Sequence, residues 1–146
     1  MRDGQVRRLS RLHRGLYRLT GGRLGRRLVD NDMLLLTTTG RHSGRRHKVP
    51  LLFLTQGDTL VVIASYGGRD HHPAWYLNLV ADPEVEVQVS KRSFEARART
   101  ADPDERASWW PRVVDAYGGY AVYQTRTDRE IPVVLIEPLI SPRSER

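Results

Sequence analysis

Apolar residues recur along the chain with two different spacings, one typical of a helix and one typical of strands. Near the start, five of them are three or four residues apart: Val6, Leu9, Leu12, Leu16 and Leu19. Arginines occupy many of the positions between them, so the pattern predicts an amphipathic helix over residues 5–28. Six later segments have the alternation or the apolar density of short strands. They are Met33–Thr38, Lys48–Thr55, Leu60–Ser65, Val85–Val89, Phe94–Thr100 and Ile131–Glu137.

Two further helices are predicted between these strands. A short one over residues 73–80 starts on a proline, which suits a first helical turn. Asp102 and Glu105 match a capping box that starts a longer helix. That helix runs toward Tyr123, with an irregularity expected at the glycine pair 118–119. Six short strands with two or three helices predict a mainly β protein with helices (α+β), in which the strands form a small antiparallel barrel.

Length and composition narrow the class of protein. The 146 residues are enough for one domain with its own core. The chain has no cysteine, so disulfides and thiolate chemistry are excluded. No apolar run approaches the roughly 20 residues that a membrane-spanning helix needs, and the N-terminus lacks the apolar segment of a secretory signal. We therefore expect a cytoplasmic protein.

Positive charge is concentrated at the N-terminus. Residues 1–27 hold nine arginines and one acid, for a net charge of +8, whereas the rest of the chain holds 15 basic and 16 acidic residues, for a net charge of −1. A nucleic-acid-binding domain usually spreads its basic surface over the folded body, so no nucleic-acid partner is expected. We divide the chain into a basic arm over 1–27, a barrel domain over 28–140 and a disordered tail over 141–146. The helix over 5–28 either packs its apolar stripe on the barrel or lies on an anionic membrane, at the inner membrane face.

Four segments resemble the deazaflavin-dependent nitroreductase family, in the same order and with similar spacing. They are Leu34–Pro50, Val62–Gly68, His72–Pro83 and Trp110–Leu135. The resemblance implies a split β-barrel of the flavin-reductase type and the deazaflavin coenzyme F420 as hydride carrier. It also implies an oxidoreductase that reduces quinones, nitro compounds or activated double bonds. Flavin mononucleotide (FMN) stays open as an alternative cofactor.

The polar turn after the first strand suits an anionic cofactor. Coenzyme F420 carries a phosphodiester and a glutamate tail, which require cations and exposed backbone N–H groups. We assign this turn and the strand after it to cofactor binding, with the residues Arg41, His42, Ser43, Gly44, His47, Lys48, Pro50, Leu51 and Leu52. His42 and His47 stand where the family usually has lysine and arginine. An ordinary solvated basic turn is the alternative.

Two later segments complete the predicted cofactor site. One is a strand end with two glycines, which permits close approach of a ring or a phosphate: Ala64, Ser65, Tyr66, Gly67 and Gly68. In the other, Trp75 and Asn78 share one helix face, and the resemblance places them near the cofactor. Alternatively, Trp75 belongs to the core and Asn78 caps a neighbouring loop. His71 and His72 have no third ligand at metal spacing, so no metal site is predicted.

Tyr117, Tyr120 and Tyr123 recur at intervals of three residues in the last predicted helix. Their rings can stack on a planar acceptor, and a phenol can hydrogen-bond or protonate its oxygen. We assign these tyrosines the catalytic role, with Tyr120 or Tyr123 polarising the acceptor. The glycines between the first two favour a mobile lid. An aromatic packing stripe is the alternative.

The sequence thus predicts an F420-dependent oxidoreductase that acts on a small-molecule hydride acceptor, as a monomer or a homodimer. Two other readings stay open. One is an FMN-dependent reductase of the same fold. The other is a non-catalytic protein that binds a flavin-like cofactor or a lipid.

Overall fold

The computed structural model describes residues 33–139, and the helix predicted over 5–28, the rest of the basic arm and the tail over 141–146 lie outside this range. The strands are β1 (Met33–Thr39), β2 (Arg46–Leu52), β3 (Leu54–Gln56), β4 (Thr59–Ile63), β5 (Glu84–Val89), β6 (Arg92–Thr100) and β7 (Val133–Pro138). The helices are the 3-10 turn η1 (Tyr66–Gly68), α3 (Ala74–Ala81), α4 (Pro103–Ala116) and α5 (Gly119–Thr125). No helix among residues 33–139 is long and apolar enough to span a membrane.

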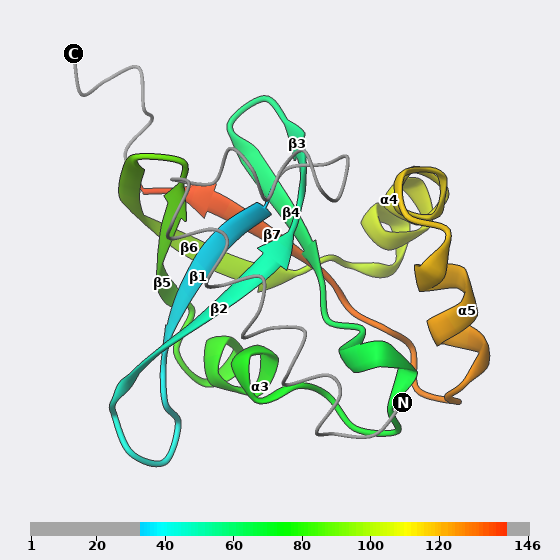
Figure 1. The fold of residues 1–146 in the computed structure, drawn as a ribbon, viewed down its shortest axis with the longest axis horizontal. Helices are drawn as coiled ribbons and strands as arrows, with labels where there is room; N and C mark the ends of the chain where they lie inside the picture. The colour runs from blue at the N-terminus through cyan, green and yellow to red at the C-terminus, as the bar shows by residue number, and fades with distance from the viewer. Residues whose placement is uncertain (1–32, 140–146) are drawn as a thin grey trace.

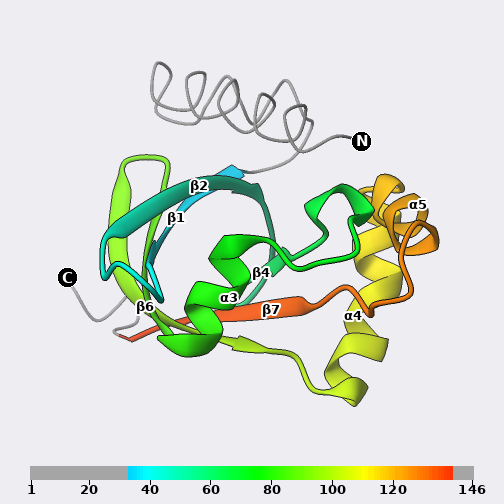
Figure 2. The same cartoon turned by 90° about the horizontal axis from the view of Figure 1, so that it is seen from below.

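The strands form one antiparallel sheet in the order β2-β1-β5-β6-β7-β4-β3 (Figure 1). Its two edge strands, β2 and β3, are separated in sequence only by Phe53. Two strands joined by a single residue can lie at opposite edges of one sheet only if the sheet curls until those edges come together. Figure 2 shows this curl, which is the split barrel predicted from the sequence.

The prediction of one strand over Lys48–Thr55 is therefore wrong in one respect. The chain is extended on both sides of Phe53, but β2 pairs with β1 and β3 pairs with β4. The break gives seven strands instead of six. Alternation along the sequence does not reveal it, because the break arises from closure of the sheet and leaves the apolar pattern intact.

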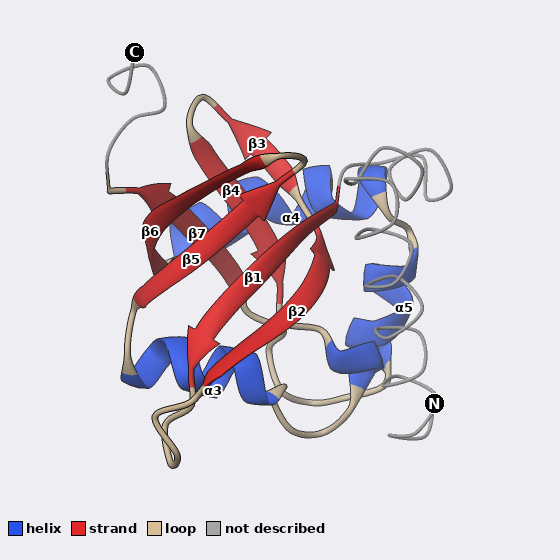
Figure 3. Cartoon of the chain, turned by 60° about the vertical axis from the view of Figure 1, so that its left-hand side comes forward, coloured by secondary structure: helices blue, strands red, loops and turns tan. Residues whose placement is uncertain are grey.

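Strand alternation builds a core on each side of the sheet. On β4, Leu60 and Val62 join the inner core of the curl, whereas Val61 and Ile63 join an outer core under α4. Strand β7 alternates in the same way. Helix α3 contributes Tyr76 to the inner core and lies across the lower end of the sheet (Figure 3). Burial of a side chain of this size stabilises the fold by about 1.5–3 kcal/mol.

The helix predicted from Asp102 toward Tyr123 begins as expected but is two helices. Asp102 accepts a hydrogen bond from the backbone of Glu105, whose side chain accepts one from the backbone of Asp102, so the capping box is confirmed. Helix α4 then ends at Ala116, and α5 begins at Gly119. Glycine costs about 1 kcal/mol in a helix interior, which explains the break at the predicted glycine pair.

Candidate functional site

The β1–β2 turn is a defined backbone frame that carries exposed cations. Within it, the Gly40 N–H donates to the Arg45 carbonyl at 2.7 Å, and the Gly44 N–H donates to the Gly40 carbonyl at 2.9 Å. A Cβ added at Gly40 would lie 2.7 Å from Ser43 Oγ and 2.8 Å from His47 Nε2, so a larger residue would force these side chains apart. All side chains from residue 41 to residue 48 are exposed. The turn thus combines a fixed backbone with charges that face solvent.

Asn78 ties this turn to α3. Its Oδ1 accepts from the backbone N–H of Arg41 at 3.1 Å and from Nη1 of the same residue at 2.9 Å. Its Nδ2 donates to Thr38 Oγ1 at 3.3 Å. The Asn78 side chain is 5% exposed, so these partners enclose it. Of the two interpretations left open by the sequence, these contacts are those of a loop anchor, and they orient Arg41. Trp75 is half-buried against the inner core.

Strand alternation separates basic residues that lie close in sequence. His47 pairs with Thr38 and shares its face of the sheet, whereas Arg46 and Lys48 lie on the opposite face. On that face, Arg46 forms an ion pair of 3.5 Å with Glu86. The structure thus brings His47 to the side of the turn that packs over Gly40, and it does not bring Lys48 there.

The three apolar residues predicted to follow in the cofactor site are divided in the same way. Leu51 packs against the inner core. Pro50 and Leu52 alternate to the outer face, where Leu52 contacts the buried side chains of Met33 and Leu35. These residues therefore reach two different environments.

The loop after β4 has three consecutive residues with positive φ. The values are 48° at Tyr66, 66° at Gly67 and 80° at Gly68. A non-glycine residue held in this region costs roughly 1–3 kcal/mol, and such residues concentrate at functional sites. A Cβ added at Gly68 would lie 2.5 Å from the carbonyl oxygen of Tyr123. The predicted cofactor loop is therefore in direct backbone contact with the helix of the tyrosines.

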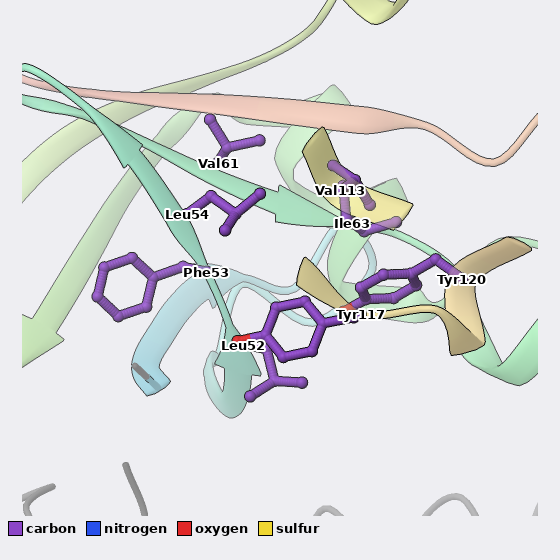
Figure 4. Close-up of a pocket in the computed structure, with 8 residues that line it drawn as sticks. All are labelled: Leu52, Phe53, Leu54, Val61, Ile63, Val113, Tyr117 and Tyr120. Atoms are coloured by element: carbon purple, nitrogen blue, oxygen red, sulfur yellow. The ribbon is translucent and has the colours of Figure 1, made fainter. Parts of the chain in front are cut away.

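The three tyrosines form an edge-to-face ladder. The ring centroids of Tyr117 and Tyr120 are 5.7 Å apart at 82°, and those of Tyr120 and Tyr123 are 6.1 Å apart at 75°. The first two rings line a narrow apolar gap beside the β2–β3 bend, which has no space for a water-sized molecule in this structure (Figure 4). The rest of its lining is Leu52, Phe53, Leu54, Val61, Ile63 and Val113. The rings of Tyr120 and Tyr123 also pack against the outer core.

Burial changes the chemistry open to one of these phenols. It raises the pKa of Tyr120 above the usual value of about 10, and the neighbouring Tyr123 adds to this effect. A phenol with a raised pKa keeps its proton more firmly. Tyr120 is therefore suited to donate a hydrogen bond to a developing negative charge and poorly suited to give up its proton.

Arg129, which holds the predicted cofactor loop, was not predicted from the sequence. This half-buried residue precedes β7, and its guanidinium contacts the backbone of Ala64, Ser65 and Arg69. The acceptors are backbone carbonyls about 60 residues away, so neither a motif nor a spacing could reveal the interaction. The predicted site elements, which are the β1–β2 turn, α3, η1 and α5, follow one another along one edge of the molecule (Figure 1).

Comparisons with known proteins identify the family and the fold of this chain. A family model described as F420H(2)-dependent quinone reductase matches residues 9–138. A Mycobacterium tuberculosis protein named F420H(2)-dependent quinone reductase is 38% identical over 132 residues, which cover 88% of this chain and 89% of that protein. A solved F420-H2-dependent reductase is 42% identical with a TM-score of 0.66, over 72% of this chain and 93% of that chain. A heme storage protein from Vibrio cholerae shares only the fold, at 15% identity and a TM-score of 0.56 over 74% of this chain and 82% of that chain.

Proposed function

This chain belongs to the F420H(2)-dependent quinone reductase family, and from that premise we propose that the β1–β2 turn binds the anionic part of coenzyme F420 while α5 receives the acceptor. The chain is an oxidoreductase with F420 as its cofactor. The family to which it belongs indicates quinones as its hydride acceptors. We propose nitro compounds and activated double bonds as further acceptors.

The observation that carries this proposal is the β1–β2 turn. Its backbone is held by its own hydrogen bonds and by Asn78, while Arg41, Ser43 and Arg45 are exposed. Asn78 Oδ1 takes one of the five N–H donors of the Arg41 guanidinium, and the planar group suits a phosphate or a carboxylate. The residues present thus fit an anionic cofactor, with His42 and His47 contributing weaker donors than the family's usual cations.

The chain's own residues supply binding, orientation and exclusion of water. When bound, F420 would supply the hydride, because hydride transfer is the chemistry of the cofactor itself. The loop Ala64–Gly68 lies against the helix of the tyrosines, because Gly68 has no side chain that would strike the Tyr123 carbonyl. The rings of Tyr117 and Tyr120 lie among apolar side chains, which suit a planar apolar acceptor such as a quinone once the narrow gap between them opens.

Reduction of a quinone places negative charge on an oxygen of the acceptor. A hydrogen bond aimed at that oxygen lowers the barrier, because it is strongest when the charge has formed. We assign this donor role to the hydroxyl of Tyr120 or Tyr123. Tyr120 keeps its proton over the whole physiological pH range, since its pKa is raised by burial.

A titration of the full chain with oxidised F420 and, separately, with FMN tests the cofactor proposal. Each cofactor's own fluorescence reports binding, and we expect F420 to bind and FMN to bind far more weakly. Reduced F420 is then supplied with a quinone, a nitroarene and an activated enone, and its oxidation is followed. Tight F420 binding without turnover of any acceptor would indicate a non-catalytic binding protein, and preference for FMN would contradict the proposal.

A further inference from the structure

Arg129 makes an unusually complete set of contacts for a residue in a connection between elements. Its Nε donates to the Arg69 carbonyl at 2.8 Å, its Nη1 to the Ala64 carbonyl at 3.2 Å, and its Nη2 to the Ser65 carbonyl at 2.7 Å. Its Nη1 also lies 2.9 Å from His72 Nδ1. Four contacts from one guanidinium therefore hold both ends of the segment from residue 64 to residue 72.

We propose that Arg129 is a positioning residue that clamps the Ala64–Gly68 loop against the α5–β7 connection, so that the loop and the tyrosine helix keep a fixed relation. The inference rests on the proposed function, because it assumes that this loop lies beside the cofactor. Arg129 acts through the backbone carbonyls of the loop and is not assigned contact with cofactor or acceptor.

Other contacts join the same two segments. The Ala64 N–H donates to the Pro132 carbonyl at 3.0 Å. Arg126 Nη1 lies 3.5 Å from the Gly67 carbonyl, and Gly68 is in backbone contact with Tyr123. The contacts of Gly67 and Gly68 hold the later part of the loop, while Arg129 holds Ala64 and Ser65 at its start and Arg69 just after its end. Without the clamp, the strained backbone at Tyr66 would lose part of the surroundings that hold its positive φ.

The clamp also sets the state of His72. Because Arg129 donates to Nδ1, the imidazole must be neutral and carry its proton on Nε2. The pKa of His72 lies below its usual range, chiefly through burial and then through electrostatic interaction with Arg129 and His71. The centroid of the Tyr76 ring lies 4.8 Å from that of the imidazole. The pKa of Arg129 is lowered chiefly by burial, and Asp70 is the acidic residue whose electrostatic interaction raises it by a smaller amount. Loss of the guanidinium should therefore raise the pKa of His72.

The test compares Arg129→Lys and Arg129→Gln with Arg99→Lys. The control also removes a guanidinium with several hydrogen bonds, from Arg99 to Glu105 and Glu137, outside the predicted site. Without cofactor, NMR titration should show a raised His72 pKa in Arg129→Gln, and hydrogen exchange should quicken in the 64–69 backbone while β4 and β7 keep their protection. With cofactor, both Arg129 variants should bind F420 about tenfold or more weakly, the scale of one lost charge-assisted hydrogen bond.

A second variant covers the case in which Arg129→Gln fails to fold. His72→Gln leaves the guanidinium in place and should quicken exchange in the same loop to a smaller extent. F420 affinity equal to that of the unaltered chain in folded Arg129→Lys, or equal loosening in Arg99→Lys, would overturn the inference and leave Arg129 with a stabilising role only. If the unaltered chain does not bind F420, the proposed function fails, while the His72 titration and the exchange data still decide whether the clamp exists.

Discussion

At the scale of single residues, Arg41 is anchored through its backbone N–H, while its side chain is exposed to solvent. Asn78 binds both its backbone N–H and its guanidinium, so the turn keeps one anchor even when the side chain is removed. Binding of an anion can therefore be separated from folding of the turn by a single substitution.

We expect Arg41→Ala to weaken F420 binding by about 1.5–3 kcal/mol, the scale of a hydrogen bond to a charged group. The melting temperature should change little, because the backbone contact to Asn78 remains. Fluorescence titration and thermal unfolding measure the two effects. Arg92→Ala is the matched control, since it removes the same charge from an exposed position on β6. A large loss of stability with unchanged affinity would show that Arg41 is structural.

At the scale of elements, α5 combines a ladder of rings with backbone contact to the cofactor loop. The ladder is continuous from Tyr117 at the end of α4 through Tyr120 to Tyr123. Removing one hydroxyl leaves the rings and their stacking in place, so a phenylalanine substitution tests the hydroxyl alone.

Tyr120→Phe and Tyr123→Phe should separate a polarising role from packing. If one hydroxyl stabilises the reduced oxygen of the acceptor, that variant should lose about 100-fold in turnover, the lower range for loss of a charge-stabilising donor, while F420 affinity holds. In the unaltered chain, ionisation of Tyr120 should cause no loss of turnover below about pH 10, because its pKa is raised. Tyr76→Phe is the control, since it removes a hydroxyl that bonds Thr100 outside the ladder. Full turnover in both test variants with every acceptor would assign the phenols to packing.

Elements were predictable from the sequence where local signals decide them. The capping box at Asp102 and the helix break at the glycine pair are local, and both were predicted. The break at Phe53 was not, because it depends on β2 pairing with β1 and β3 pairing with β4, at opposite edges of the sheet. The same holds for the site. Turn chemistry is local and makes Arg41 and Ser43 candidates, whereas Arg129 and the face occupied by Lys48 depend on contacts between distant parts of the chain.

At the scale of the whole molecule, β1 begins with buried apolar residues that follow the basic arm in the sequence. Met33 and Leu35 are 1% and 3% exposed and point away from the inner core, and among the described residues Leu52 is the partly buried apolar side chain packed against them. The basic arm over 1–27 precedes Met33 by a few residues and carries the apolar stripe from Val6 to Leu19. We therefore expect the arm to pack on the barrel, as amphipathic helices of small domains usually do.

Removal of residues 1–20 should accordingly lower the melting temperature of the protein, and calorimetry measures the change. The membrane alternative makes a different prediction. In that case the truncated chain keeps its stability and its turnover of soluble acceptors, but loses binding to anionic vesicles, which in the full chain weakens with added salt. A truncated chain with full stability would contradict packing of the arm.

The sheet order has a consequence for how the protein is made. Strand β7 follows the other six strands along the chain, yet it lies between β6 and β4 and pairs with both. Until β7 has left the ribosome, the nascent chain holds two separate pieces of sheet, β2-β1-β5-β6 and β4-β3. Each then has an open edge that only β7 can cover, and open strand edges invite pairing with other chains. Before its last strand is available, the growing polypeptide therefore has two edges open to such pairing, and β7 closes both at once.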